Sequence, residues 1–143
     1  MKIERFEDLT AWQEARALVA LIYGATATAP FSNDRELVRQ MRRAAVSVMS
    51  NIAEGFSRYS YRDSKQFFMV SRSSLAELRS QSYVAADQGY ANHEELVAMQ
   101  ESMERVGKLV TGLIRNSREQ LARAEVNRVS DSAIEPLSYR TQS

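Results

Sequence analysis

The sequence predicts an all-α protein, an antiparallel up-down-up-down four-helix bundle, and three observations support this prediction. Only five glycines and two prolines occur among 143 residues, so few residues would interrupt a helix. Apolar residues recur every three or four positions in four separate stretches, which is the spacing of one helix face. The connections between these stretches are short, and short connections favour neighbouring helices of alternating direction.

The first predicted helix starts at Asp8 or Thr10 and extends to about Thr26. Either starting residue could accept hydrogen bonds from the free amides of a first helical turn. The apolar positions at helical spacing are Leu9, Trp12, Val19, Ile22 and Tyr23. Leu18 and Leu21 widen this stripe beyond one face, so we expect the helix to make contacts on two sides.

The second predicted helix starts after Asn33, a residue suited to capping, and ends near Gly55. Asp34 and Glu36 follow the cap, where negative charge complements the positive end of the helix dipole. The expected core residues of this helix are Leu37, Met41, Ala44, Val48 and Ile52. Their spacing places them on one face of the helix.

The third predicted helix starts at Ser60 or Tyr61 and ends before Gly89, and the fourth starts after the capping residue Asn92. The core residues expected for the third helix are Phe68, Ser71, Leu75, Leu78, Ser82 and Ala85. Those expected for the fourth are Leu96, Met99, Met103, Val106, Val110 and Leu113. This alternation by four and three positions is typical of the seam of a left-handed bundle.

The chain divides into two parts by its apolar pattern. Residues 1–124 are predicted to form the bundle domain, because the helical spacing continues to about that point. Residues 125–143 mix serine, arginine, aspartate and proline without a periodic apolar face. Such a segment buries too little surface to offset the entropy of ordering, so we predict a disordered tail.

Composition argues against several classes of protein. There are no cysteines, which excludes disulfides and thiolate metal sites. His93 is the only histidine and the glycines occur singly, so neither a Ser-His-Asp triad within one subunit nor a phosphate-binding glycine loop is expected. We therefore expect no enzymatic activity, no cofactor and no metal. The absence of a signal peptide and of any apolar run of about 18 residues predicts a cytoplasmic protein that does not enter membranes.

Charge is distributed unevenly along the chain, although the formal net charge is only +1. Residues 33–72 carry eight basic and four acidic side chains, a net charge of +4, whereas residues 73–100 carry one and four, a net charge of −3. The candidate nucleic-acid-binding residues in the basic part are Arg35, Arg39, Arg42, Arg43, Arg58, Arg62 and Lys65.

Steps of four and three residues place Arg35, Arg39 and Arg42 on the face of the second helix opposite its core stripe, with Arg43 beside them. Clustered guanidinium groups suit contacts with phosphates. Tyr59 and Tyr61 alternate with the remaining cations, a combination found in proteins that bind single strands. The alternative is a solvated face whose arginines pair with acidic side chains of the same or a neighbouring subunit.

The non-core face of the second helix becomes apolar beyond the arginines, at Val46, Met49 and Ala53. A monomeric bundle would leave this second stripe in contact with water. Together with Leu18 and Leu21 on the first helix, it predicts a subunit interface and therefore a homo-oligomer. The alternative is that loops or the tail cover these residues.

Several motifs resemble the four-helix-bundle proteins encoded in intervening sequences of bacterial 23S ribosomal RNA genes. Each motif is weak alone, but their order and spacing are specific to the family over residues 3–117. The matching segments are Phe6-Glu7-Asp8-Leu9, Ala11-Trp12-Gln13, Ala15-Arg16, Gln40-Met41-Arg42-Arg43-Ala44-Ala45, Asn51-Ile52-Ala53-Glu54-Gly55, Phe67-Phe68, Arg72 to Leu78, and Gly89-Tyr90.

The resemblance implies an antiparallel four-helix bundle. Members similar to the accessory variability determinant of diversity-generating retroelements form pentameric rings with a basic surface, and they bind nucleic acid and a reverse transcriptase. For this chain the resemblance thus implies an oligomeric ring, a pentamer, with RNA or DNA and a reverse transcriptase or another protein as candidate partners. The function we expect is that of an accessory or ribonucleoprotein-type module, and the alternative is a protein–protein interaction scaffold with no nucleic-acid role.

Overall fold

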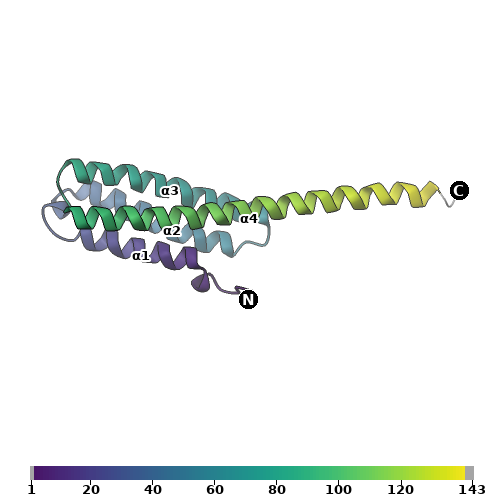
Figure 1. Cartoon of the computed structure of the whole chain (residues 1–143), viewed down its shortest axis with the longest axis horizontal. Helices are drawn as coiled ribbons and strands as arrows, with labels where there is room; N and C mark the ends of the chain where they lie inside the picture. Colours follow the sequence, from purple (N-terminus) through teal and green to yellow (C-terminus); the bar gives the residue numbers. More distant parts are fainter. Residues whose placement is uncertain (1, 141–143) are drawn as a thin grey trace.

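The structure, a computed structural model, describes residues 2–140, with side chains as far as residue 132. Every regular element in this part of the chain is helical (Figure 1), which confirms the all-α prediction. The elements are the 3-10 helix η1 (Phe6–Asp8), α1 (Thr10–Ala25), the 3-10 helix η2 (Phe31–Asn33), α2 (Arg35–Phe56), α3 (Tyr61–Asp87) and α4 (His93–Arg140). Within these described residues, no helix combines the length and apolarity that crossing a membrane requires.

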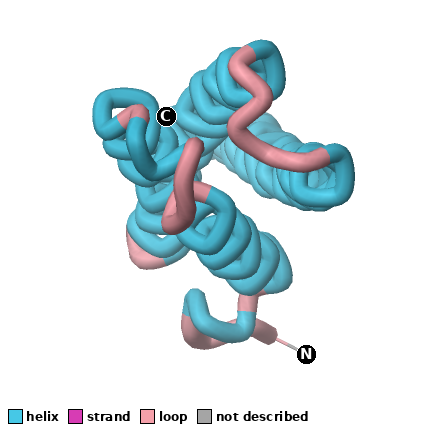
Figure 2. Tube along the Cα trace, turned by 90° about the vertical axis from the view of Figure 1, so that its left-hand side faces the viewer, coloured by secondary structure: helices cyan, strands magenta, loops and turns pink. Residues whose placement is uncertain are grey.

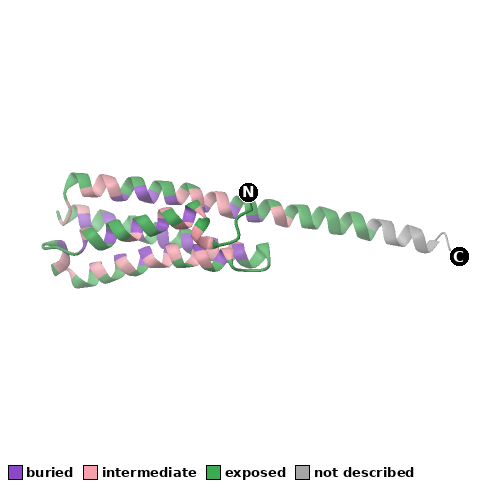
Figure 3. Ribbon diagram, turned by 90° about the horizontal axis from the view of Figure 1, so that it is seen from below, coloured by how far each residue is buried: buried purple, intermediate pink, exposed green. Residues whose placement is uncertain are grey.

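The four α-helices surround one core. α1 packs against α2 and α4, and α3 packs against the same two helices. Figure 2 shows the helices nearly end-on, and Figure 3 shows that their buried residues face the inside of the bundle. The expected core residues of α2 and α3 are all buried, as are four of the six expected for α4, whereas Leu96 and Leu113 pack against the core half-buried.

The core face of α1 differs from its prediction. Its buried residues are Ala11, Ala15, Leu18 and Ile22. Leu18 is 0% exposed, so its assignment to a subunit interface was wrong. Small alanines on one face allow α1 to approach its neighbours, and the larger Leu9, Trp12 and Val19 pack around the edge of the core. The spacing of the large side chains therefore predicted the wrong face, because the alanines determine which side of α1 is buried.

Three of the helix starts show how the polypeptide satisfies its first free amides. Asn92 caps α4 as predicted, and Ser60, one of the two residues at which α3 was predicted to start, caps that helix. Each accepts a hydrogen bond from the amide three residues later, at 2.8 Å for Asn92 and 3.1 Å for Ser60. Asn33 does not cap α2 as predicted, because it belongs to η2 and Asp34 performs that role at 3.1 Å. α1 follows Leu9, which has no side-chain acceptor.

α2 ends at Phe56, near Gly55 as predicted, but Gly55 lies within the last turn of the helix and is not its C-cap, which is Ser57. The role of Gly55 is steric. A Cβ atom at residue 55 would lie 2.5 and 2.7 Å from two ring carbons of Phe68. The neighbouring turns of α2 and α3 are joined by small polar side chains, with Ser71 Oγ donating to the Val48 carbonyl at 2.8 Å. The two helices therefore approach closely along this seam.

α4 is the longest element and projects beyond the other helices (Figure 1). Among its residues with described side chains, Ser117 is the last buried one, and residues 122–132 are exposed. The sequence predicts a disordered tail over residues 125–143, whereas the structure continues the helix to Arg140, and residues 141–143 lie outside the described part of the chain. Neither glycine nor proline occurs between Gly112 and Pro136, and an ion pair between Glu125 and Arg128 at 2.5 Å supports the helix locally.

Candidate nucleic-acid interface

The four arginines predicted on α2 meet in one shallow groove beside α1. Its volume is about 580 Å³. The residues that line this α1/α2 groove are Tyr23, Ser32, Arg35, Val38, Arg39, Arg42, Arg43 and Val46. Spacing on the α2 helix brings the arginines to one side, and α1 with η2 supplies the opposite wall. The structure thus brings together the first four of the seven predicted cations.

Arg42 is largely engaged inside the protein. Its Nε donates to Thr26 Oγ1 at 2.9 Å and its Nη2 donates to the Tyr23 carbonyl at 3.4 Å. The guanidinium also lies over the Tyr23 ring, 4.4 Å from its centroid. These contacts place a positive charge at the carboxyl end of α1, where it complements the helix dipole. Arg42 therefore joins α2 to α1 and has fewer donors left for a ligand.

Arg39 is partly neutralised by Glu36, whose Oε2 lies 2.5 Å from the arginine Nη2. Glu36 also accepts a hydrogen bond from Gln40 at 2.9 Å. The hydrogen bond from Gln40, followed by the charge of Arg39, lowers the pKa of the Glu36 carboxyl. Glu36 consequently remains a carboxylate at neutral pH and offsets one of the four positive charges in the groove.

Arg35 and Arg43 are the freest cations of the groove. Both are exposed, and among the residues with described side chains neither forms an ion pair. A guanidinium group that is not already paired keeps its planar set of donors for a phosphate. A test of the α1/α2 groove should therefore substitute these two residues.

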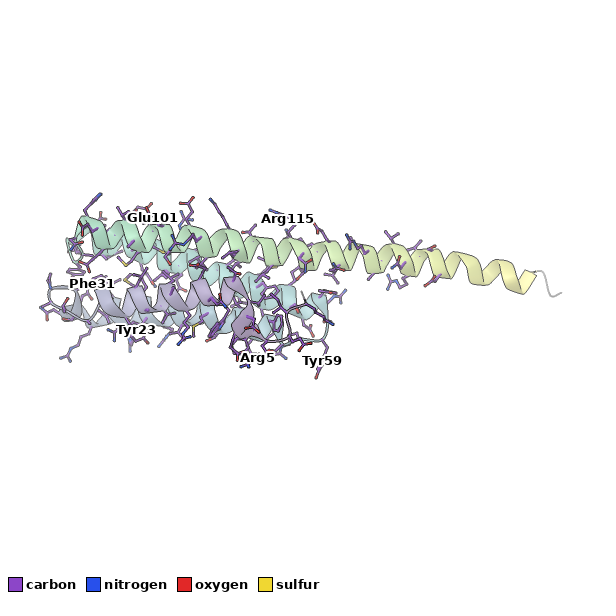
Figure 4. All side chains as sticks on the ribbon, turned by 60° about the horizontal axis from the view of Figure 1, so that its bottom comes forward. Arg5, Tyr23, Phe31, Tyr59, Glu101 and Arg115 are labelled. Atoms are coloured by element: carbon purple, nitrogen blue, oxygen red, sulfur yellow. The ribbon has the colours of Figure 1, made fainter. Side chains whose placement is uncertain are left out.

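The other three predicted cations lie elsewhere. Arg58 follows α2, where its guanidinium pairs with Glu54 at 2.9 Å and lies over the Phe67 ring, 4.4 Å from its centroid. Arg62 and Lys65 lie in the first turns of α3. The 22 residues of α2 from Arg35 to Phe56 form roughly 33 Å of helix, and Arg58 lies beyond its end. Figure 4 shows Tyr23 and Tyr59, which mark the two groups, toward opposite ends of the bundle. The seven residues do not form one site.

The apolar residues predicted for a subunit interface are also separated. Val46, Met49 and Ala53 are half-buried on α2, and Met49 packs against the core. Leu21 is 37% exposed, but it lines a different depression, between α1 and α4. With Leu18 in the core, these five residues do not share a single surface.

A second basic groove, which was not predicted from the sequence, lies between α3 and α4. Its volume is about 520 Å³. The residues that line this α3/α4 groove are Arg72, Leu75, Ala76, Arg79, Met103, Glu104, Gly107, Lys108, Thr111 and Arg115. The available signal was spacing, because two of the cations are seven residues apart on each helix and hence share a face. The low net charge of the surrounding sequence obscured it.

The fold and the grooves define a helical-bundle protein with basic hollows on its surface. Residues 7–112 match the family described as 23S rRNA-intervening sequence protein, and the chain belongs to this family, as its motifs predicted. A crystal structure of a protein with unknown function from the S23 ribosomal protein family, from Bacteroides thetaiotaomicron, is similar. The TM-score is 0.64 at 15% identity, over 73% of this chain and 98% of that chain. No curated protein matches the sequence.

Proposed function

We propose that this protein is a non-enzymatic, oligomeric nucleic-acid-binding module of an accessory or ribonucleoprotein type. The observation that carries the proposal is the α1/α2 groove, whose lining residues include four arginines and no carboxylate, although Glu36 pairs with Arg39 at its edge. An excess of guanidinium groups in one hollow is relieved by phosphates, which accept paired hydrogen bonds and replace condensed counterions. The groove contains no recognisable base-reading motif, so little sequence preference is expected.

Replacing Arg35 and Arg43 together with alanine tests the groove and spares Arg42, which holds α1 and α2 together. Binding of single-stranded RNA and DNA would be measured by fluorescence anisotropy over a range of salt concentrations. Each lost phosphate contact should reduce the slope of log affinity against log salt by roughly 0.7 units for a single strand.

The matched control replaces Arg118 and Arg123, two exposed arginines of α4 outside the groove, and removes the same charge. Light scattering must show unchanged mass for each variant, because a broken oligomer would lose avidity without losing a phosphate contact. Parental affinity and slope in the Arg35→Ala, Arg43→Ala variant would contradict the proposal.

The second candidate function is a protein–protein interaction scaffold. The observation that favours it is that Arg39, Arg42 and Arg58 already make contacts within the chain. In a scaffold the remaining cations would pair with acidic side chains of a neighbouring subunit or partner. Absence of salt-sensitive binding to RNA and to DNA in the parent protein would favour this function over the first. The family resemblance adds a reverse transcriptase as a candidate partner.

For the assembly we propose an antiparallel, up-down-up-down bundle that forms a homo-oligomeric ring, a pentamer by the family resemblance. Short connections between successive helices and the half-buried apolar side chains Val46, Met49 and Ala53 support this proposal. Val46→Glu should dissociate the oligomer, because an unpaired charge would be buried at the interface. The control is Val70→Glu on α3. A monomeric mass for the parent protein by light scattering at micromolar concentration would overturn the assembly.

A further inference from the structure

The α3/α4 groove lies on the other side of the bundle from the α1/α2 groove. α2 and α4 each contact both α1 and α3, so the seam between α1 and α2 and the seam between α3 and α4 are opposite edges of the four-helix arrangement. Arg115, at one end of the α3/α4 groove, and Tyr23, in the α1/α2 groove, lie on opposite sides of the bundle in Figure 4. A ligand in one groove therefore leaves the other accessible.

Four cations border the α3/α4 groove. Arg72 and Arg79 lie on α3, and Lys108 and Arg115 lie on α4. Each pair is seven residues apart, which is about two turns or roughly 10.5 Å along a helix. This spacing exceeds the width of one phosphate group, so a ligand that contacts the whole groove must carry several negative charges along its length.

The opposing charge in this groove is small. Glu104 is its only carboxylate, and it lies 3.5 Å from Lys108, with both side chains at least 70% exposed. Exposed pairs of this kind contribute little and open easily. Among the residues with described side chains, Arg72, Arg79 and Arg115 form no ion pair. The guanidinium groups are thus available to an incoming anion.

The floor of the groove is built from small and already buried groups. A Cβ atom at Gly107 would meet only Leu75, at 3.4 Å, so the missing side chain leaves open space between the two helices. Leu75 and Met103 are only 4% and 2% exposed. An acidic amphipathic helix needs exposed apolar surface for its anchors, and this floor offers little. The observations favour a ligand held by charge.

The groove continues toward an aromatic residue. A neighbouring hollow of about 470 Å³ shares Arg79, Met103 and Glu104 with it and is also lined by Tyr83 and Gln100. Tyr83 is 61% exposed, so its side chain is accessible to a nucleic-acid base. A track of cations that ends at an exposed ring is the combination that holds a single strand without reading its sequence.

We propose that the α3/α4 groove is a second phosphate-backbone site and that one protomer binds two segments of single-stranded nucleic acid, one on each side of the bundle. The class of ligand rests on the proposed function, whereas the location and the stoichiometry go beyond it. The protomer would then link two strands, or two distant parts of one strand, without any change in its own conformation.

The experiment counts the bound strands. A single-stranded octanucleotide of RNA would be titrated into the protein and the number bound per protomer measured by sedimentation, which does not depend on the oligomeric state. The parent protein should bind two per protomer. The Arg72→Ala, Arg79→Ala variant should bind one, the Arg35→Ala, Arg43→Ala variant one, and the variant with all four changes none. The Arg118→Ala, Arg123→Ala control should still bind two.

A second variant tests the same groove without a change of charge. Gly107→Met places a side chain in the open space of the groove floor and should also reduce the number of strands bound per protomer to one. Gly107→Ala should leave that number at two. Thermal unfolding monitored by circular dichroism must show that each variant is folded.

The outcomes separate the two proposals. Two strands bound by a folded Arg72→Ala, Arg79→Ala variant would overturn the second site and leave the α1/α2 groove untouched. Suppose instead that the Arg35→Ala, Arg43→Ala variant binds two strands and the Arg72→Ala, Arg79→Ala variant binds one. This result would overturn the assignment of the α1/α2 groove as a binding site and retain the second site. No binding by the parent protein would overturn both. Binding of a polyglutamate peptide in place of RNA would overturn the second site in favour of an acidic protein partner.

Discussion

The α2–α3 seam and the projecting end of α4 are both helical, but they are maintained by different interactions. At the seam, Gly55 and Ser71 let the backbones approach, and Ser47 and Ser74 bond across it at 2.8 Å. Beyond residue 121 the described side chains of α4 are exposed, and the helix projects past the other three (Figure 1). The seam depends on the shape of side chains that are distant in sequence, whereas the projecting end depends on local helix propensity alone.

The largest expected effect comes from Gly55→Ala, which places a methyl group against the Phe68 ring. Because the seam is closely packed, we expect a loss of about 1–3 kcal/mol in the free energy of unfolding. The matched control is Gly112→Ala in α4, where a Cβ atom meets nothing within 4 Å. That change should stabilise the helix by about 0.5–1 kcal/mol. Urea unfolding measures the change in the free energy of unfolding for both variants. Equal changes at Gly55 and Gly112 would refute the close approach at Gly55.

A smaller effect is expected at the start of α2. Asp34→Ala removes the cap of this helix and the acceptor of the Tyr90 hydroxyl, which donates to Asp34 Oδ2 at 3.0 Å. Loss of such a cap costs about 1 kcal/mol. Asn33→Ala, one residue earlier and outside the cap, should change the free energy of unfolding little. A similar loss in both variants would show that Asp34 is not the capping residue.

The same contact predicts a dependence on pH. Hydrogen bonding to Asp34, with some burial, raises the pKa of the Tyr90 hydroxyl above its ordinary value of 10.0. The stabilisation is therefore complete below the ordinary pKa of tyrosine and is lost as pH rises through the raised value. In the Asp34→Ala variant, ultraviolet titration should show one tyrosine with a lower pKa. An unchanged titration curve would mean that this hydrogen bond does not form in solution.

The smallest effect on stability is expected from removing the projecting end of α4. Ending the chain after Ala124 removes only exposed side chains among those that the structure describes, so the midpoint of thermal unfolding should stay nearly unchanged. Ending it after Gly112 also removes the buried Ile114 and Ser117 and should lower the midpoint clearly. If the two truncations lowered it equally, the projecting end would be packed against a neighbouring subunit.

Most of the fold could be predicted because it depends on local patterns. The spacing of Met41, Val48 and Ile52 defines one face of α2 whatever the partner is, and Ser60 and Asn92 identify helix starts through their own side chains. Gly55 shows the limit of such patterns. Its role depends on Phe68, thirteen residues later on another helix, and sequence position alone suggested a helix end.

The candidate sites were less predictable for the same reason. Spacing on α2 correctly grouped Arg35, Arg39 and Arg42, but the engagement of Arg42 by Thr26 depends on how α1 meets α2. The α3/α4 groove requires residues from two helices and the absence of a side chain at Gly107. The seven-residue spacing of the cations on each helix was visible in the sequence, but the pairing of the two helices into one groove depends on how they pack.

The length of α4 has a hydrodynamic consequence. Residues 118–140 extend the helix by roughly 35 Å at 1.5 Å per residue, close to the length of α3 itself, so the protomer is a rod rather than a sphere (Figure 1). Such a particle experiences more friction than a compact one of 16.2 kDa. Its sedimentation coefficient falls below, and its apparent radius rises above, the values for a sphere of the same mass. Rotation about the long axis is faster than end-over-end tumbling, so a label near Val129 reports a different rotational correlation time according to its angle to the α4 axis.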